Sequence, residues 1–236
     1  MRTGDNRVAT ILDLYHRELS DRFPAGEVKA IMRAVFSDRL GWDPMDLELC
    51  KQEALSESEL LDVYLPLKRI RSGEPLQYIL GRTNFHGLEL VVAPGVLIPR
   101  PETEELIELI IRSEIAPKKI VDIGTGSGCI ALALKKEFPN ASVIGIDVSI
   151  EALAIARRNG ERLSIDVEWL QADILDHAFE LPADLDLIVS NPPYVPRSEE
   201  RSLSIEVRDH EPHLALFVED IDPLKFYRTI ADHSLR

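Results

Sequence analysis

The sequence lacks most of the features that mark secreted, membrane-spanning or metal-binding proteins. It has two cysteines, Cys50 and Cys129, which are too few for a disulfide framework and have no metal-ligand spacing. No apolar run approaches the roughly 20 residues needed to cross a bilayer. Residues 1–10 lack the apolar core of a signal peptide. These absences predict a soluble, cytoplasmic protein without a metal site.

Positive charge is also scarce. The 27 lysines and arginines are outnumbered by 41 aspartates and glutamates, which gives a formal net charge of −14 and a pI of about 4.9. Such a surface repels phosphate backbones, so it argues against a nucleic-acid substrate, although a local basic patch remains compatible with it. With 236 residues, 45% of them hydrophobic, the chain can form one large domain or two smaller ones around a real core.

Residues 1–80 have helical patterns throughout and predict a small bundle. The expected helices follow apolar stripes or capping signals: 8–19, ended by Pro24; 28–40, with Gly41 as C-cap; a short one opening at Asp43-Pro44; 57–71, after a Ser56–Glu59 capping box; and a last turn within 74–80. Pro66 predicts a kink or break in the fourth helix. We interpret the bundle as a substrate-docking domain; the alternative is that its helices merely flank the main core.

The pattern changes after Gly81. Residues 81–98 predict a β-hairpin that links two domains. From residue 99 a helix is followed by alternating signals, with strands at 119–123, 142–147, 167–170 and 185–189 and helices at 127–138 and 150–162. Such alternation predicts an α/β, Rossmann-like domain over residues 99–236, in which a parallel sheet is covered by helices on both faces.

A glycine-rich loop follows the first strand of this domain. Glycine allows sharp turns and close approach to a ligand beside a helix N-terminus. A dinucleotide fingerprint, G-x-G-x-x-G, would need glycine at position 129, which is Cys129. The run Asp-x-Gly-x-Gly-x-Gly instead resembles the first motif of class I S-adenosylmethionine-dependent methyltransferases. That resemblance implies that Asp122, Gly124, Thr125, Gly126, Ser127 and Gly128 bind the cofactor, whose methionine part lies against the loop.

Two further acids follow later strands. Asp147 ends the next strand, where an acid can bind both ribose hydroxyls, and Asp173 follows the third strand, where such enzymes hold the adenine amino group. Next to Asp173, Ile174 stands at a position where many methyltransferases of this type carry an aromatic residue beside the adenine. Each acid alone is better explained as a helix cap or a solvated charge. Three acids at successive strand ends after a glycine loop favour cofactor binding.

The fourth strand stops at Asn191-Pro192-Pro193-Tyr194, because proline lacks an N–H and fixes φ. Alone, this run is equally well explained as a strand stop and a surface turn. It resembles the acceptor motif of enzymes that methylate a planar nitrogen. In that interpretation the Asn191 side-chain oxygen and the Pro192 carbonyl accept the N–H hydrogens, while Tyr194 stacks on the planar group. Adenine-N6 and cytosine-N4 DNA methyltransferases share the motif, so it specifies the geometry of the nitrogen rather than the substrate.

Most of the chain from about residue 70 resembles one family, the HemK/PrmC protein-glutamine N5-methyltransferases. The matching stretches are 73–81, 85–88, 94–104, the glycine loop, 190–194, 207–212 and 215–216, and the run Ile98-Pro-Arg-Pro-Glu-Thr-Glu104 is highly specific. The resemblance implies S-adenosyl-L-methionine as cofactor, S-adenosyl-L-homocysteine as product, and the glutamine of the Gly-Gly-Gln loop of peptide chain release factors as substrate. Asn191, Pro192, Pro193 and Tyr194 would contact that glutamine, and Asn191 would also lie beside the cofactor.

The same resemblance carries further expectations. The class has strand order 3-2-1-4-5-7-6, so the first and fourth strands should be neighbours, with the ligands beyond their ends. Members of the family continue with a fifth strand and a terminal hairpin, which predicts that this chain is C-terminally truncated. Truncation would expose the edge of the fourth strand and impair activity. The alternative is a naturally short protein. A monomer is expected. Two other functions stay open: methylation of an exocyclic amine in DNA or RNA, and binding of cofactor or release factor without turnover.

Overall fold

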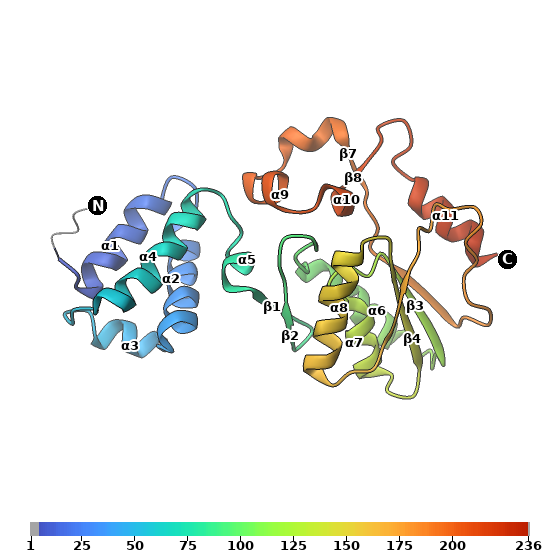
Figure 1. Cartoon of the computed structure of the whole chain (residues 1–236), viewed down its shortest axis with the longest axis horizontal. Coiled ribbons are helices and arrows are strands. Elements are labelled where there is room, and N and C mark those ends of the chain that lie inside the picture. Colours follow the sequence, from blue (N-terminus) through green and yellow to red (C-terminus); the bar gives the residue numbers. More distant parts are fainter. Residues whose placement is uncertain (1–4, 236) are drawn as a thin grey trace. The chain divides into compact units, whose positions relative to one another are not determined.

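The computed structural model describes residues 5–235, and the chain forms two compact units that meet in sequence between Leu80 and Gly81 (Figure 1). The first unit is entirely helical. Its helices are α1 (Val8–Leu19), α2 (Ala25–Leu40), α3 (Pro44–Leu49), α4 (Glu57–Arg71) and α5 (Leu76–Leu80). Their apolar stripes, with Tyr15 and Phe36 fully buried, pack into one core. Burial of these stripes, rather than helix propensity alone, stabilises helices of this length.

Local signals set the ends of these helices. Gly41 adopts φ 70° and caps α2, a left-handed conformation that glycine reaches without a Cβ penalty. Ser56 and Glu59 form a reciprocal capping box at the start of α4. The expected break at Pro66 is wrong, because α4 continues through it to Arg71, while a kink there stays a prediction. Pro66 is buried in the unit, and packing there offsets the one hydrogen bond that proline cannot donate.

The second unit opens with a β-hairpin of strands β1 (Arg82–Phe85) and β2 (Leu88–Val91). Its two-residue turn, His86-Gly87, has positive φ at both positions, the geometry that fits the twist of paired strands. Phe85, Leu88 and Leu90 are buried in the core of the second unit. The hairpin expected as a linker therefore lies within that unit and packs against it.

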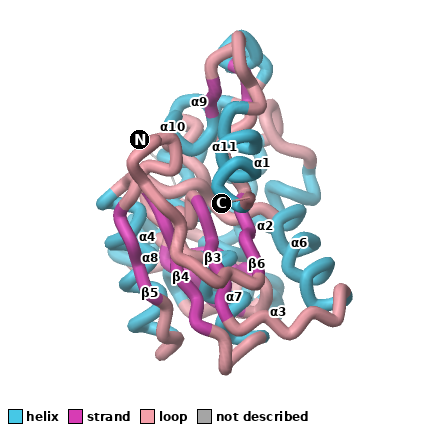
Figure 2. The backbone as a smooth tube through the Cα atoms, turned by 90° about the vertical axis from the view of Figure 1, so that its right-hand side faces the viewer, coloured by secondary structure: helices cyan, strands magenta, loops and turns pink. Residues whose placement is uncertain are grey.

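A four-stranded parallel sheet forms the centre of the second unit (Figure 2). Its strands are β3 (Lys119–Ile123), β4 (Ser142–Asp147), β5 (Glu168–Gln171) and β6 (Leu187–Ser190), in the order β5-β4-β3-β6. The prediction that the first and fourth strands are neighbours is confirmed. Ile123 pairs with Ser190 on one side and with Ile146 on the other. Gly124, Asn191 and Asp147 come directly after Ile123, Ser190 and Ile146. They therefore lie at the same edge of the sheet.

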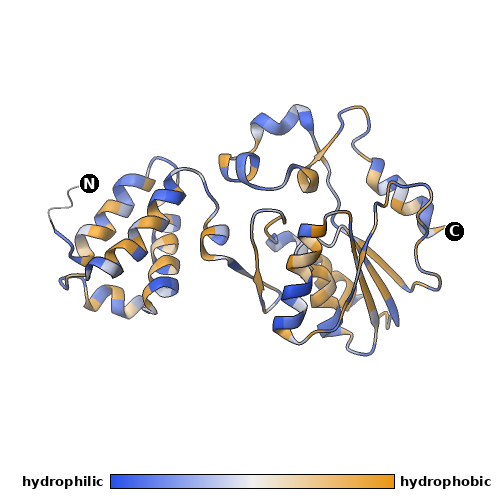
Figure 3. Ribbon diagram, viewed as in Figure 1, coloured by the Kyte–Doolittle hydropathy of each residue, from blue (hydrophilic) through white to orange (hydrophobic). Residues whose placement is uncertain are grey.

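Strands β3 and β4 are apolar and buried along most of their length, as expected for parallel strands covered on both sides (Figure 3). Ile120, Val143 and Val189 share a core with helices α6 (Pro101–Arg112) and α7 (Cys129–Glu137). On the other face, Val121 and Ile144 share a core with side chains of α11 (Lys225–Ser234). The prediction of a Rossmann-like α/β fold with helices on both faces is confirmed.

Helix α7 starts later than predicted, at Cys129 instead of residue 127, because Gly128 has φ 81° and cannot belong to a right-handed helix. Helix α8 (Ile150–Leu163) follows β4. After β6 the chain forms β7 (Val195–Pro196), a 3-10 turn (Arg197–Ser202), α9 (Ile205–His210), α10 (His213–Leu216) and β8 (Phe217–Val218), and β7 pairs with β8. Across residues 5–235, none of the helices has both the length and the apolar character needed to cross a membrane.

Candidate active site

The loop between β3 and α7 is a tight turn that depends on its glycines. Gly124, Gly126 and Gly128 have φ of 72°, 57° and 81°, values that strain any residue with a Cβ. The N–H groups of Gly124 and Thr125 both donate to the Ile146 carbonyl, at 2.8 and 2.9 Å. The loop is thus tied to the end of the neighbouring strand β4.

Asp122 supports this loop from beneath. It is fully buried, and its Oδ2 accepts hydrogen bonds from the Thr125 hydroxyl (2.6 Å) and the Ala131 N–H (3.2 Å). Burial raises the pKa of this carboxyl group to about 7, against the lowering effect of those two hydrogen bonds. Among the described residues, Asp122 Oδ1 and Ser127 Oγ have no hydrogen-bond partner. An uncharged carboxyl group suits this dry position better than a carboxylate.

A tryptophan behind the loop was not anticipated. A Cβ at Gly145 would lie 2.5 Å from a ring carbon of Trp169, and one at Gly128 would lie 2.8 Å from the same indole. Both distances are shorter than real Cβ contacts, so β4 and the loop need glycine at these positions. The indole fills the space that two side chains would otherwise occupy. Sequence reasoning explained Gly128 by the sharp turn and the ligand, and gave Gly145 no role.

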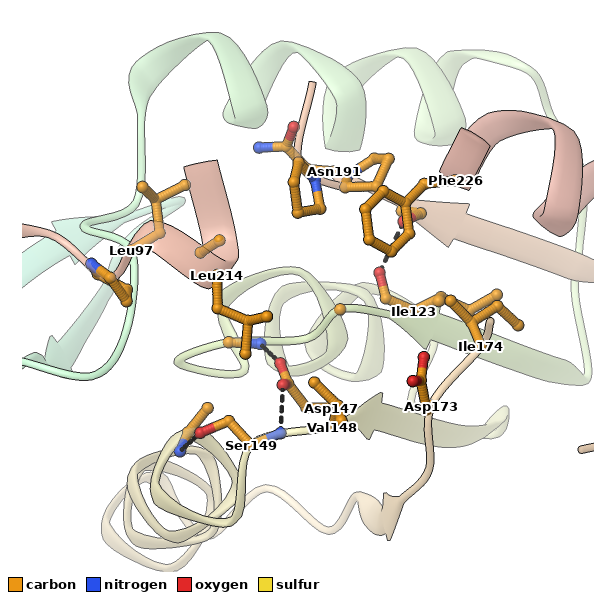
Figure 4. A pocket seen from close by; sticks show the side chains of 18 of the residues that line it. Leu97, Ile123, Asp147, Val148, Ser149, Asp173, Ile174, Asn191, Leu214 and Phe226 are labelled. Carbon is orange, nitrogen blue, oxygen red and sulfur yellow. Dashed lines mark hydrogen bonds between the residues drawn. The ribbon is translucent and has the colours of Figure 1, made fainter. Parts of the chain in front are cut away.

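Asp147 joins the glycine loop to the start of α8. Its Oδ2 accepts from the Gly126 N–H at 2.8 Å and its Oδ1 from the Ser149 N–H at 2.9 Å (Figure 4). Burial raises the pKa of Asp147, while these backbone donors act in the opposite direction. Each carboxylate oxygen has a second lone pair, so both can still accept a hydroxyl hydrogen. Asp173 is exposed, and its Oδ1 accepts from the Leu175 N–H at 2.9 Å.

These strand ends open into a cavity of about 720 Å³. Eight of the predicted site residues line it: Gly124, Gly126, Asp147, Asp173, Ile174, Asn191, Pro192 and Pro193. In the view of Figure 4, Asn191 lies on one side of the cavity and Asp147 and Asp173 on the other. Strands β3, β4, β5 and β6 therefore each deliver residues to one space, as expected for ligands at the carboxyl edge of a parallel sheet.

Five predicted site residues do not line this cavity. Asp122, Thr125 and Ser127 are buried beneath the glycine loop. Gly128 packs on Trp169 instead. Tyr194 is 57% exposed, and its stacking on a planar substrate group stays a prediction.

The remaining walls come from segments to which sequence reasoning gave no roles. Residues 95–97 and 212–215 line the cavity, as does Phe226 of α11. Glu211 ties the first two segments together: its carboxylate accepts from the Arg100 guanidinium at 2.5 Å and from the Ile98 N–H at 3.2 Å. The Glu211 side chain is 1% exposed. The two stretches containing Arg100 and Glu211 were noted as motifs, but nothing in their spacing predicted that they meet.

The acceptor loop is fixed by hydrogen bonds to two neighbouring elements. The Ser190 hydroxyl donates to the Ile123 carbonyl at 2.7 Å, which joins the end of β6 to that of β3. The Asn191 side-chain nitrogen donates to the Thr103 hydroxyl oxygen of α6 at 3.3 Å. No described residue donates a hydrogen bond to Asn191 Oδ1.

The residues present fit S-adenosylmethionine. A volume of about 720 Å³ lies within the range of small-molecule sites. Gly124 and Gly126 carry no side chain, which leaves room for the methionine part, and the Asp147 carboxylate oxygens can accept from ribose hydroxyls. Ile174 offers an apolar surface for the adenine ring, with Asp173 beside it. The fold and this site define a class I, S-adenosylmethionine-dependent methyltransferase.

Comparison with known proteins gives the family. The methyltransferase small domain matches residues 102–208, and the PrmC N-terminal domain matches residues 16–81. A release factor glutamine methyltransferase of Bacteroides thetaiotaomicron is 44% identical over 227 residues, covering 96% of this chain and 81% of that protein. Proteins of the same name from Flavobacterium psychrophilum and Koribacter versatilis are 47% and 42% identical, over 81% and 86% of this chain and 69% and 72% of theirs. The chain belongs to the release factor glutamine methyltransferase family.

Proposed function

We propose that this enzyme transfers a methyl group from S-adenosyl-L-methionine to the side-chain amide nitrogen (N5) of the glutamine in the Gly-Gly-Gln loop of peptide chain release factors. The observation that carries the proposal is the Asn191 side chain, which lies at the cavity and whose Oδ1 accepts no hydrogen bond from residues 5–235. The names of the relatives support the substrate.

Asn191 and Pro192 would prepare the substrate nitrogen. An amide nitrogen is a poor nucleophile because its lone pair is delocalised. With one N–H hydrogen bonded to Asn191 Oδ1 and the other to the Pro192 carbonyl, the amide is oriented and positive charge developing on nitrogen is stabilised. When bound, the cofactor supplies an electrophilic methyl group on a sulfonium. No strong base is needed, because the nitrogen becomes acidic only as the methyl group arrives.

The partner we propose is therefore a protein that acts in translation, which would place the enzyme in the cytoplasm. The net charge of −14 supports a protein substrate over DNA or RNA. Gly124, Gly126, Asp147, Asp173 and Ile174 are the proposed cofactor contacts. Asp122, Thr125, Ser127 and Gly128 would act by holding the loop.

Label transfer from methyl-labelled cofactor tests the proposal. The enzyme is incubated with a release factor or with duplex DNA, and the label is located by peptide mapping. We expect the label on the glutamine of the Gly-Gly-Gln loop and none on DNA. Label on DNA would identify an exocyclic-amine methyltransferase instead, and cofactor binding without transfer to either would identify a binding module.

The same assay with variants of Asn191 tests the mechanism. Asn191→Ala removes the acceptor and should lower turnover on the order of a hundred-fold or more, the usual loss for one transition-state hydrogen bond. Asn191→Asp keeps an acceptor oxygen and should retain more activity than Ala. If Asn191 is only structural, Asp and Ala should fail equally and both should lower the melting temperature. Normal turnover by Asn191→Ala would overturn the mechanism.

A further inference from the structure

Helix α6 contains a buried threonine where its pattern calls for an apolar residue. The buried residues of α6 are Thr103, Ile107 and Ile110, spaced by four and three positions on the face that packs against the sheet. A buried hydroxyl without a partner is destabilising, so a polar group on this face needs one. Its partner in this structure is Asn191, 88 residues further along the chain.

The hydrogen bond between them anchors the Asn191 amide. The two ends of a side-chain amide have nearly the same shape, but one end donates and the other accepts. In this structure Nδ2 is directed to the Thr103 hydroxyl oxygen at 3.3 Å, and none of the residues that the structure describes donates to Oδ1. Figure 4 shows the Asn191 amide at the edge of the cavity. The Thr103 hydroxyl can also donate, so the reversed amide could bond to it through Oδ1. Only the orientation in this structure leaves Oδ1 for the substrate, because an NH₂ group cannot accept an N–H hydrogen.

We propose that Thr103 is a positioning residue for methyl transfer: by accepting from Asn191 Nδ2, it keeps Asn191 Oδ1 available to the substrate amide. Thr103 does not line the cavity, so it acts only through Asn191. The inference rests on the proposed function and adds a residue of α6 to its machinery. It also explains why threonine occupies a position where valine would pack equally well.

Thr103→Val tests this role, because valine matches the shape of threonine and has no hydroxyl. We expect kcat for release factor methylation to fall about tenfold, the equivalent of one net hydrogen bond. Affinity for S-adenosylhomocysteine should stay unchanged, because Thr103 does not touch the cofactor site. The melting temperature should be equal or higher, since a buried polar group is removed. Thr103→Ser, which keeps the hydroxyl, should restore most of the turnover.

A double-mutant cycle with Asn191→Ala separates positioning from general support of the fold. If Thr103 acts through Asn191, Thr103→Val should cause no further loss of single-turnover rate in the Asn191→Ala background. An equal loss in both backgrounds, or wild-type turnover by Thr103→Val, would overturn the inference. Thr103→Ala provides a second hydroxyl-free variant if valine lowers the yield of folded protein. Wild-type turnover by Asn191→Ala would instead refute the role proposed for Asn191, on which this inference rests. Failure of the wild type to methylate the release factor would refute the proposed function itself.

Discussion

Asp122 occupies a position at which protonation and folding are coupled. Its carboxyl group is fully buried under the glycine loop, and burial raises its pKa to about 7. An aspartate in the unfolded chain has a pKa near 3.9. Between these two values the unfolded state has released its proton while the folded state still holds it. The free energy of unfolding must therefore fall as the pH rises through this window.

Asp122→Asn should remove this dependence, because asparagine is uncharged at every pH and keeps an oxygen for Thr125 and Ala131. We expect the wild type to lose stability relative to the variant between about pH 4 and 7, by at most about 1.4 kcal/mol per pH unit for one proton. Urea unfolding of both proteins at several pH values measures the difference. Parallel stability curves would show that Asp122 is ionised in the folded protein.

At the scale of elements, most of the fold was readable from the sequence. The resemblance to class I methyltransferases implied the pairing of the first and fourth strands of the sheet, which the structure confirms. Apolar stripes, a capping box and turn glycines predicted the helices of the first unit, and the alternation after residue 99 predicted the parallel sheet. These signals are local, or follow from rules of chain connection. The predicted start of helix α7 is two residues too early, because nothing in the sequence indicates that Gly128 adopts a left-handed conformation.

Contacts between distant loops could not be predicted in the same way. The Arg100–Glu211 pair joins residues 111 positions apart, and the Thr103–Asn191 bond joins residues 88 apart. The path of the chain after Pro192 depends on short, irregular elements without periodicity, so no pattern places Glu211 beside Arg100. The contact of Trp169 with Gly145 was likewise hidden, because the pairing register of β4 and β5 is needed to see it.

The Arg100–Glu211 ion pair should be the main interaction between the two segments, 95–97 and 212–215, that line the cavity. Glu211→Gln removes the charge that faces a partly buried guanidinium. We expect a loss of about 1–3 kcal/mol in the free energy of unfolding, together with reduced turnover, because residues 95–97 and 212–215 would lose their common anchor. Guanidinium unfolding and label transfer measure the two effects.

Asp209→Asn is the matched control for this prediction. Asp209 pairs with Arg208 at 2.6 Å in the same segment, but its side chain is 47% exposed. A salt bridge this exposed contributes little to stability, so this variant should behave nearly as the wild type. Equal effects of both substitutions would mean that burial of the Arg100–Glu211 pair has no special importance.

At the scale of the whole molecule, each unit has its own hydrophobic core. The core residues of the first unit all come from the five helices and their connections before Gly81, and those of the second come from the hairpin, the sheet and its covering helices. Every residue that lines the cavity lies in the second unit. Cofactor binding should therefore need the second unit alone, which leaves substrate docking as the function we infer for the first.

Deletion of residues 1–80 tests whether the first unit docks the substrate and the second unit alone binds the cofactor. The remaining chain keeps both cores of the second unit, so it should fold and bind S-adenosylhomocysteine with unchanged affinity. Its KM for an intact release factor should rise at least tenfold, because the docking contacts are lost. A short peptide spanning the Gly-Gly-Gln loop reaches only the cavity, so the deletion should leave its kcat/KM unchanged and thereby serve as the control. An unchanged KM for the intact factor would refute docking by the helical unit, and loss of peptide methylation would show that this unit supports the active site itself.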